Sequence, residues 1–245
     1  MAKKKLAIRP LQVTQSEGVQ AVMTYLVGFD KEMKAGGYMF FIEGADKAIL
    51  VDASGSADSL KAAGFSSTQT ASPEDALSKV GLKCQDIDMV ILTHLHFDHI
   101  EYASKFTKAK FICQSAELRE ALRPHPGVDT MLYWPHLYQD LKFVTVSGDQ
   151  EISEGIRVML TPGHTPGGQT VLVETEKGIA AITGLCSIME NYFPPEPYDK
   201  ILGMITPGIH DNPQLAMESM NVIKHTADII VPIHDIKWST VKSIP

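Results

Sequence analysis

The stretch Thr93-His94-Leu95-His96-Phe97-Asp98-His99 places three imidazoles and a carboxylate within the six residues that start at His94. The mostly apolar run 88–93 leads into it and predicts a buried strand that ends where the histidines begin. Alternate residues of an extended segment share a face, so His94 and His96 can point toward one ion. The aspartate and histidine that follow fall where a helix is expected to begin, so they can face a second position beside the first. An isolated histidine is usually an ordinary surface or core residue, but this density of ligands predicts a metal site.

The position and the chemistry of this group limit what it can bind. It lies beyond the carboxyl end of a predicted strand, which is where α/β proteins place their reactive groups. Neutral imidazole and carboxylate ligands suit Zn, Fe or Mn, and the sequence does not choose among these metals. The loop therefore predicts two neighbouring metal sites.

Three further motifs accompany the histidine motif, and each is attached to an apolar run. Residues 47–54 end a predicted strand with an aspartate, residues 160–169 form a glycine-rich turn with a histidine, and residues 229–235 end a last strand with a histidine. In this order the four motifs resemble those of the metallo-β-lactamase-fold hydrolases, over about residues 20 to 235. No single downstream motif is specific, whereas the ordered set is.

The resemblance implies an α/β fold, the αββα sandwich, in which two mixed β-sheets face each other and helices cover the outer faces. The 245 residues and the hydrophobic content of 44% permit a large core. No long linker rich in Gly, Ser or Pro divides the chain. We therefore expect a single domain over residues 1–245.

Periodicity and capping residues predict the individual elements. Apolar runs predict the strands that lead to the histidine motif and a later meander, at residues 21–27, 38–43, 48–52, 142–146, 156–160, 170–174 and 179–183. Ser72-Pro73 predicts a helix start, with a serine cap and a proline at the first helical position. Asn212-Pro213 predicts the start of another helix, after which the chain returns to the last strand.

The resemblance assigns roles to individual residues. The first metal is expected on His94, His96 and His164, and the second on Asp98, His99 and His234. We expect two Zn ions, with Fe or Mn as alternatives. Three neutral imidazoles leave an open position for water, whose pKa a bound Zn lowers from about 16 to about 7. A metal-bound hydroxide is then available to attack the substrate at neutral pH.

Two aspartates are expected to support this chemistry. Asp98 is the expected catalytic residue besides its role as a ligand, because its carboxylate can accept a proton or orient the attacking water. Asp52 is expected to brace the metal loop through hydrogen bonds rather than to bind metal. A simple turn aspartate at the end of a strand is the alternative for Asp52.

The chain departs from the family pattern at residues 184–186. In two-metal relatives this strand end carries Gly-Asp, and the aspartate bridges both ions. Here Gly184 is followed by Leu185, which cannot bridge cations, and then by Cys186, whose thiolate is a good Zn ligand. An offset of one residue normally reverses the direction of a side chain in a strand, although a bulge or the strand end can undo this. Two interpretations of Cys186 stay open, a ligand of the second metal and a small buried residue.

The individual residues within and around the motifs indicate the class of substrate. Residues 148–152, 160–169 and 189–193 are most similar to the N-acyl homoserine lactonase branch. The active-site tyrosine of that branch falls on Ile188, and Tyr192 stands four positions later. Our leading interpretation is a metal-dependent hydrolase of a small ester, lactone or related acyl compound. The alternatives are a glyoxalase-type thioesterase, an iron-dependent sulfur or oxygen redox enzyme, and a degenerate member without catalysis.

Composition bears on partners and location. The formal net charge of −7 disfavours a nucleic-acid binder, because such affinity rests on Lys and Arg that neutralise phosphates, and a small-molecule substrate is expected instead. No apolar stretch approaches the length of a membrane span, and no apolar run follows the basic first residues, so we expect no membrane partner and a cytoplasmic location. The 3 cysteines are too few and too scattered for a disulfide framework.

Two segments rich in aromatic residues and proline, 131–138 and 193–195, have no assigned chemistry. We expect them to wall the substrate pocket, since loops near a metal often set specificity. Covering a core is the alternative. An exposed apolar flap can also pack on a second subunit, so a homodimer is expected.

Overall fold

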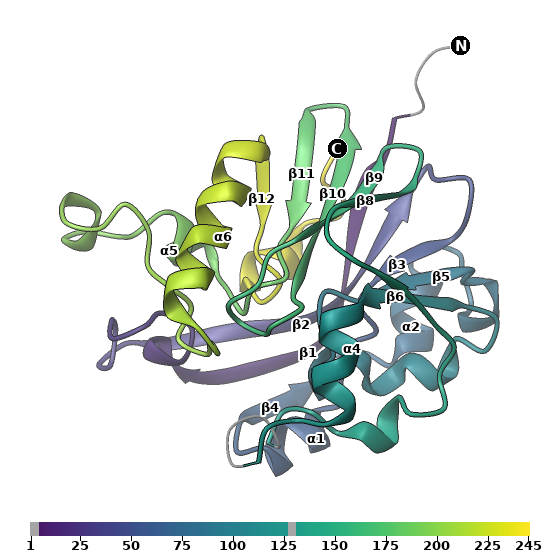
Figure 1. Cartoon of the computed structure of the whole chain (residues 1–245), viewed down its shortest axis with the longest axis horizontal. Coiled ribbons are helices and arrows are strands. Elements are labelled where there is room, and N and C mark those ends of the chain that lie inside the picture. The colour runs from purple at the N-terminus through teal and green to yellow at the C-terminus, as the bar shows by residue number, and fades with distance from the viewer. Residues whose placement is uncertain (1–4, 127–130) are drawn as a thin grey trace.

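Two β-sheets form the middle of the molecule (Figure 1). The computed structural model describes residues 5–126 and 131–245. The seven-stranded sheet has the order β4-β1-β2-β3-β5-β6-β7, and the five-stranded sheet has the order β12-β11-β10-β9-β8. The strands are β1 (Ala7–Val19), β2 (Glu32–Glu43), β3 (Ile49–Val51), β4 (Ser66–Gln69), β5 (Met89–Ile91), β6 (Lys110–Gln114), β7 (Phe143–Val146), β8 (Gln150–Ser153), β9 (Ile156–Leu160), β10 (Gln169–Thr175), β11 (Gly178–Ile182) and β12 (Ile229–Val231).

Helices and short 3-10 turns connect the strands. The α-helices are α1 (Ala57–Ala62), α2 (Pro73–Ser78), α3 (Phe97–Ile100), α4 (Ser115–Leu122), α5 (Met189–Tyr192) and α6 (Pro213–Thr226). The 3-10 turns are Gln20–Val22, Cys84–Asp86, Glu101–Lys105, Pro135–Leu137, Tyr198–Lys200 and Ile236–Thr240. None of the helices in residues 5–126 and 131–245 has both the length and the apolar character that crossing a bilayer requires.

Both sheets are mixed, and their parallel parts lie next to the histidine motif. In the larger sheet β4, β1, β2 and β3 pair antiparallel, whereas β3, β5, β6 and β7 pair parallel. In the smaller sheet β8 to β11 form an antiparallel meander, and β12 joins β11 in parallel. Because parallel strands end at the same edge of a sheet, the segments after β3 and β5 emerge side by side.

Three apolar clusters fill the layers. The first lies between the sheets and joins residues such as Ile42 and Ile91 of one sheet to Val171 and Ile182 of the other. The second covers the outer face of the larger sheet with residues of α2 and α4, and the third packs α6 on the outer face of the smaller sheet. The predicted αββα sandwich of two mixed sheets is therefore confirmed.

The two predicted helix starts are confirmed, because their caps form as expected. The Ser72 hydroxyl accepts a hydrogen bond from the Asp75 amide, and Pro73 is the first residue of α2. The Asn212 side chain accepts hydrogen bonds from the amides of Gln214 and Leu215 at the start of α6. These contacts are local, so the sequence alone predicts them well.

The strands of the structure depart from the predicted ones in three ways. Residues 21–27 form turns rather than a strand, and Leu26 has a φ of 58°, which no strand residue adopts. Four strands were missed, which are β1, β4, β6 and β8. Strand β7 pairs in parallel with β6 in the larger sheet and does not belong to the meander. In each case the partner strand decides the structure, and the run itself does not reveal its partner.

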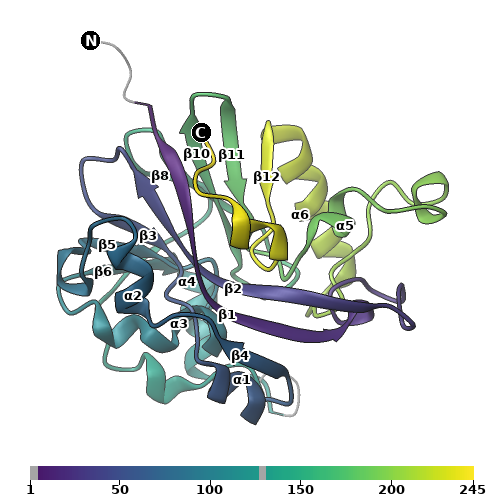
Figure 2. The ribbon, with the colours of Figure 1, turned by 180° about the vertical axis from the view of Figure 1, so that it is seen from behind.

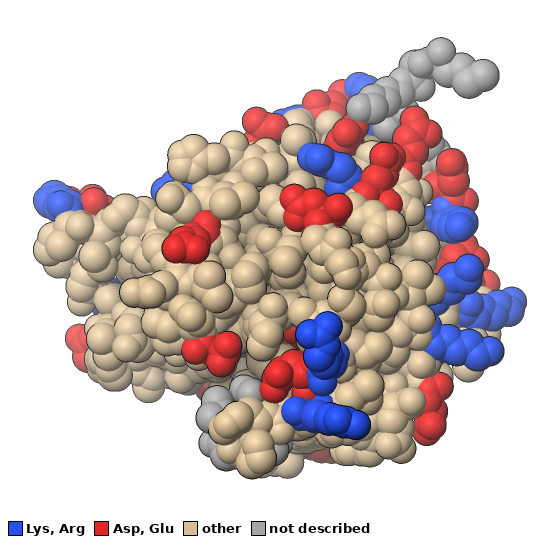
Figure 3. All heavy atoms as spheres, viewed as in Figure 1, with Lys and Arg blue, Asp and Glu red and all other residues tan. Residues whose placement is uncertain are grey.

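The C-terminal residues pack beside β1, and charged side chains are distributed unevenly over the surface. From behind, the last residues lie beside β1, where Ile8 and Ile244 exchange backbone hydrogen bonds of 2.9 and 2.8 Å (Figure 2). Uncharged side chains cover most of the face over α5 and α6, and basic and acidic side chains are mixed toward the other side of the same view (Figure 3). The basic side chains visible on this face thus stand among acidic ones.

Candidate metal centre

The predicted ligands converge on one edge of the sandwich from both sheets. His94 follows β5, and Asp98 and His99 lie in the short helix α3 that begins directly after His96. His164 lies on the loop between β9 and β10, and His234 follows β12. Strand pairing in the two sheets therefore fixes the strand ends, and the strand ends fix the positions of the ligands.

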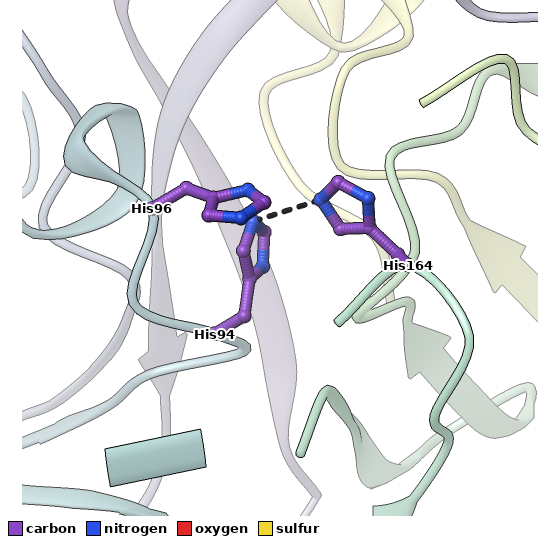
Figure 4. A group of neighbouring side chains, drawn as sticks. All are labelled: His94, His96 and His164. Carbon is purple, nitrogen blue, oxygen red and sulfur yellow. Dashed lines mark hydrogen bonds between the residues drawn. The ribbon is translucent and has the colours of Figure 1, made fainter. Parts of the chain in front are cut away.

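The first group contains His94, His96 and His164. Their nearest ring nitrogens all lie within 4.8 Å of one another, and the three side chains are buried. The rings point toward one another, and the Nε2 atoms of His94 and His164 lie 3.1 Å apart (Figure 4). The structure thus brings these three predicted ligands together.

Hydrogen bonds on the far side of the rings fix which nitrogen faces the group. His164 Nδ1 donates to the carbonyl oxygen of Ile209 at 2.9 Å. The Thr93 hydroxyl donates to Asp52 at 2.9 Å, so at 3.0 Å it accepts from His94 Nδ1. Both Nε2 atoms then carry lone pairs that face each other, and a neutral imidazole has no second proton to place between them.

A divalent metal ion fits this arrangement. Two nitrogens on one tetrahedral Zn lie about 3.3 Å apart, given bond lengths of about 2.0–2.1 Å. Burial lowers the pKa of His94 and His96 well below the usual value, and it lowers the pKa of His164 to about 3. Protonation of these imidazoles is therefore unfavourable and does not remove the repulsion between the two Nε2 lone pairs. The neutral imidazole is also the form that binds metal.

The second group contains Asp98, His99 and His234, with ligand atoms again within 4.8 Å of one another. His99 Nδ1 donates to Asp52 at 2.8 Å, and His234 Nδ1 donates to the Gly36 carbonyl at 3.1 Å. The Nε2 atom of His99 is buried, and it lies 3.3 Å from Asp98 Oδ2 without forming a well-aligned hydrogen bond. A buried ring nitrogen without a well-aligned hydrogen bond, at the centre of a group of ligand atoms, fits a metal ion as its partner.

Charge is distributed unequally in the second group. Burial works against a charged His99, but the carboxylates of Asp98 and Asp52 outweigh it and raise the pKa of His99 to about 10. Burial also works against the Asp98 carboxylate, yet His99 and His234 hold its pKa far below the usual range. Without metal, Asp98 and His99 thus form an ion pair with 3.3 Å between Asp98 Oδ2 and His99 Nε2.

Asp52 braces the metal loop, as predicted. Its carboxylate accepts hydrogen bonds from the Thr93 amide at 2.7 Å, from the Thr93 hydroxyl and from His99. It has a φ of 62°, in the left-handed region that Asp and Asn tolerate better than most residues. This backbone turn directs its carboxylate to the neighbouring strand end.

We expect Asp52→Asn to destabilise the metal-free protein more at pH 6 than at pH 10. His99 has a folded pKa of about 10, above its ordinary 6.5, so its contribution to stability is fully present below pH 6.5 and is lost as the pH rises toward 10. Asparagine keeps the backbone conformation but removes one of the two charges, those of Asp98 and Asp52, that raise this pKa. Urea unfolding at both pH values measures the difference, and an equal loss at both would contradict the role given to the Asp52 charge.

Leu185 and Cys186 follow the end of β11, and their side chains pack in different clusters. Leu185 is fully buried among residues that pack under α6, such as Met159 and Met220. Cys186 lines the same cavity as the ligands, but its sulfur lies 3.5 Å from the sulfur of Met23 and belongs to neither ligand group. Burial raises the pKa of the Cys186 thiol, with Asp98 adding to the effect. A ligand role for Cys186 stays a prediction, and packing on Met23 is what the contacts favour.

The residues that matched or neighboured the expected tyrosine do not reach the ligands. Tyr192 is fully buried in the cluster under α6. Ile188 packs with Cys186 and Met23. The position that carries the active-site tyrosine in the lactonase branch therefore supplies no hydroxyl here.

The aromatic segment that begins at residue 131 covers the site. Tyr133 packs edge to face on His96 with ring centres 4.6 Å apart, and Trp134 stacks on Phe97 at 4.3 Å. The Leu132 carbonyl accepts a hydrogen bond from the Phe97 amide at 2.9 Å. Part of this segment thus walls the cavity, as the sequence analysis favoured.

Strands β1 and β2 form one wall of the cavity, which the sequence did not predict. Thr14, Ser16 and the pair Gly36 and Gly37 line the cavity. A Cβ atom at Gly37 would lie 2.2 Å from the Thr14 hydroxyl, so this position needs glycine. Adjacent glycines inside a strand often mark close approach to another backbone or to a ligand, and this was the available signal. The other cavity walls are apolar, formed by Met23, Leu60, Phe65, Phe97, Leu132 and Ile209.

Comparison with known proteins places this geometry among enzymes of one superfamily. The model of the metallo-beta-lactamase superfamily matches residues 35–184. An N-acyl homoserine lactonase of Bacillus thuringiensis is 31% identical over 166 residues, which cover 66% of this chain and 61% of the lactonase. A probable metallo-hydrolase of Methanocaldococcus jannaschii is 30% identical over 159 residues, covering 65% of this chain and 62% of that protein. The chain thus matches about three fifths of the length of these relatives.

Solved structures match over more of the chain. An N-acyl homoserine lactone hydrolase with the product N-hexanoyl-L-homoserine bound at its catalytic metal centre has a TM-score of 0.75 and 25% identity. The match covers 98% of this chain and 96% of that chain. A quorum-quenching N-acyl homoserine lactone lactonase has the same TM-score and identity, and the match covers 95% of that chain.

Proposed function

Because this chain belongs to the metallo-β-lactamase superfamily, we propose that it is a metal-dependent hydrolase that opens small lactones, with N-acyl homoserine lactones as the substrate class. The observation that carries the proposal is the pair of ligand groups at the floor of one cavity, with imidazole lone pairs aimed inward by hydrogen bonds from Nδ1. We assign one Zn to His94, His96 and His164. A second Zn is assigned to Asp98, His99 and His234.

The metal supplies one part of the chemistry and the chain supplies the rest. When bound, a divalent metal would lower the pKa of a coordinated water and polarise the carbonyl of the lactone. The buried histidines keep the neutral form that this requires, since burial lowers the pKa of His94, His96 and His164. Water adds to the carbonyl carbon, the ring C–O bond breaks, and the product is a hydroxy acid.

Asp98 is the residue placed to move the proton. Its side chain is 22% exposed and faces the cavity, whereas the histidines beside it are buried. Neighbouring His99 and His234 hold its pKa far below the usual range, so it is ionised and can accept the proton of the attacking water. It can then return that proton to the ring oxygen that leaves.

The cavity walls favour an acyl chain over a polar substrate. Met23, Phe65 and Ile209 line it above the ligands, and apolar walls stabilise a bound alkyl chain by removing it from water. Thr14 and Ser16 are the neutral polar side chains of the wall. The substrate orientation that fits these walls places the polar lactone ring at the metals and the apolar acyl chain toward the opening.

We expect the Zn-loaded protein to hydrolyse N-hexanoyl homoserine lactone without nicotinamide, flavin or nucleotide. It should open this lactone faster than a lactone ring without an acyl chain, because only the acyl chain contacts the apolar walls. Proton release at constant pH, with the product identified by mass spectrometry, measures both reactions. Thioesters and aryl esters belong in the same panel, since a preference for thioesters would favour the glyoxalase-type alternative.

Failure of every substrate in that panel, with Zn shown to be bound by elemental analysis, would contradict the proposal. A redox or binding role would then be the better interpretation. A single domain, a cytoplasmic location and a homodimer stay predictions, and size measurement in solution tests the last of them.

A further inference from the structure

A fully buried carboxylate lies next to the first ligand group and takes no part in the chemistry proposed above. Glu117 belongs to α4 and has no solvent exposure. Both of its oxygens accept hydrogen bonds, and the donors are the Leu95 amide, the Tyr133 hydroxyl, the Thr165 hydroxyl and the Gly167 amide. A buried carboxylate is costly unless such donors surround it, so its presence here calls for a reason.

The first oxygen, Oε1, holds the loop of the histidine motif. It accepts from the Leu95 amide at 2.9 Å, and Leu95 lies between His94 and His96 in the sequence. It also accepts from the Tyr133 hydroxyl at 2.8 Å. The Tyr133 ring packs on the His96 ring at 4.6 Å, so this contact positions the covering segment as well.

The second oxygen, Oε2, holds the loop of the other sheet. It accepts a hydrogen bond from the Thr165 hydroxyl at 2.7 Å and another from the Gly167 amide at 3.1 Å. Both donors lie within three residues after His164. A Cβ atom at Gly167 would lie 2.1 Å from the Glu117 amide nitrogen. This loop therefore lies directly against the backbone of α4, and Glu117 joins two ligand loops that come from different sheets.

We propose that Glu117 is a positioning residue that sets the distance between the His94–His96 loop and the His164 loop, and thereby the metal affinity of the first ligand group. The inference rests on the metal assignment of the proposed function but not on its substrate. The three imidazoles converge only if both loops keep their places, and each loop is attached to one oxygen of the same rigid carboxylate. Partners that orient ligands from behind typically contribute about 10–100-fold to metal affinity.

Glu117→Gln is the informative change because it keeps the shape of the side chain. The amide group replaces one acceptor oxygen by a donor, so in either orientation two of the four donors lose their acceptor and face hydrogens instead. One ligand loop should then shift away from α4. Glu120→Gln is the matched control, since it removes the same charge from the same helix at a partly exposed position, where the side chain accepts a hydrogen bond from the His125 amide and contacts neither ligand loop among the described residues.

Zn affinity, measured by competition with a chromophoric chelator, tests the proposal directly. We expect Glu117→Gln to bind its tightest Zn about 10–100-fold more weakly than the unmodified protein, and Glu120→Gln to bind it equally well. The visible spectrum of the Co-loaded protein should change in Glu117→Gln, because the angles between the imidazoles report on loop position. Tyr133→Phe removes one donor without removing charge and should give a smaller loss of affinity, which keeps the test valid if Glu117→Gln does not fold.

A purely structural role predicts another result. Glu117→Gln would then lower the thermal stability of the metal-free protein while Zn affinity and the Co spectrum stay unchanged, and this outcome would overturn the inference. An equal loss in Glu120→Gln would overturn it too. Hydrolysis of lactones by the unmodified protein is measured separately. A protein that binds Zn but opens no lactone contradicts the proposed function. The effect of Glu117 is then still decided by the Zn affinities and the Co spectra.

Discussion

His164→Ala is expected to release the metal of the first group and to abolish lactone hydrolysis. Its Nε2 lies 3.1 Å from that of His94, and it is the ligand that the smaller sheet contributes to this group. Alanine leaves two imidazoles on one loop, and the described residues place no further ligand in this group. Because loss of a mere supporting partner costs up to about 100-fold in metal affinity, loss of the ligand itself should cost more than about 100-fold.

Elemental analysis after dialysis and a lactone assay at fixed Zn concentration measure these two effects. His225→Ala is the matched control, because His225 is exposed on α6 and its Nδ1 donates to the Asn221 carbonyl of the same helix. It should keep both the metal and the activity. A His164→Ala protein with its full metal content would refute the assignment of the first group.

Leu185→Asp is expected to destabilise the protein strongly and to gain no metal. The resemblance to two-metal relatives implies that aspartate at this position would restore the missing bridge between two ions. In the structure Leu185 is fully buried under α6, on the side of the sheet that faces away from the ligands. The change removes a core side chain and buries a carboxylate without a partner, which together cost at least about 4 kcal/mol.

Cys186→Asp is the contrasting variant, because Cys186 lines the cavity and Asp98 is close enough to influence its pKa. A carboxylate here should strengthen Zn binding in the second group, at a small cost to the metal-free protein through repulsion from Asp98. Urea unfolding and chelator competition compare the two variants. If Leu185→Asp were as stable as the unmodified protein and bound Zn more tightly, the observed side-chain directions would be wrong.

These variants separate two kinds of information in the chain. The ligand motif, its order relative to the later histidines and the helix caps at Ser72 and Asn212 are local patterns. Each depends on residues close in sequence, whose geometry follows from strand alternation or from one turn of a helix. They were enough to predict the αββα sandwich through the resemblance and to place six side chains in two groups.

The sequence alone left other features undecided because they depend on partners far along the chain. Strand β1 forms because it pairs with β2, and β7 joins the larger sheet because β6 lies beside it. The apolar run 21–27 makes only an isolated bridge, between Thr24 and Pro207, and otherwise turns. Hydrophobic content predicts that a segment can be a strand, but pairing decides whether it becomes one.

The site shows the same division at the level of single side chains. The sequence by itself determined which residues can bind metal, because ligand chemistry is a property of the residue type. Only the tertiary structure decided that Leu185 turns away from the ligands while Cys186 faces them, and that Glu117 joins two loops from different sheets. Direction and distance between segments far apart in the chain arise from packing of the whole fold, so no local pattern contains them.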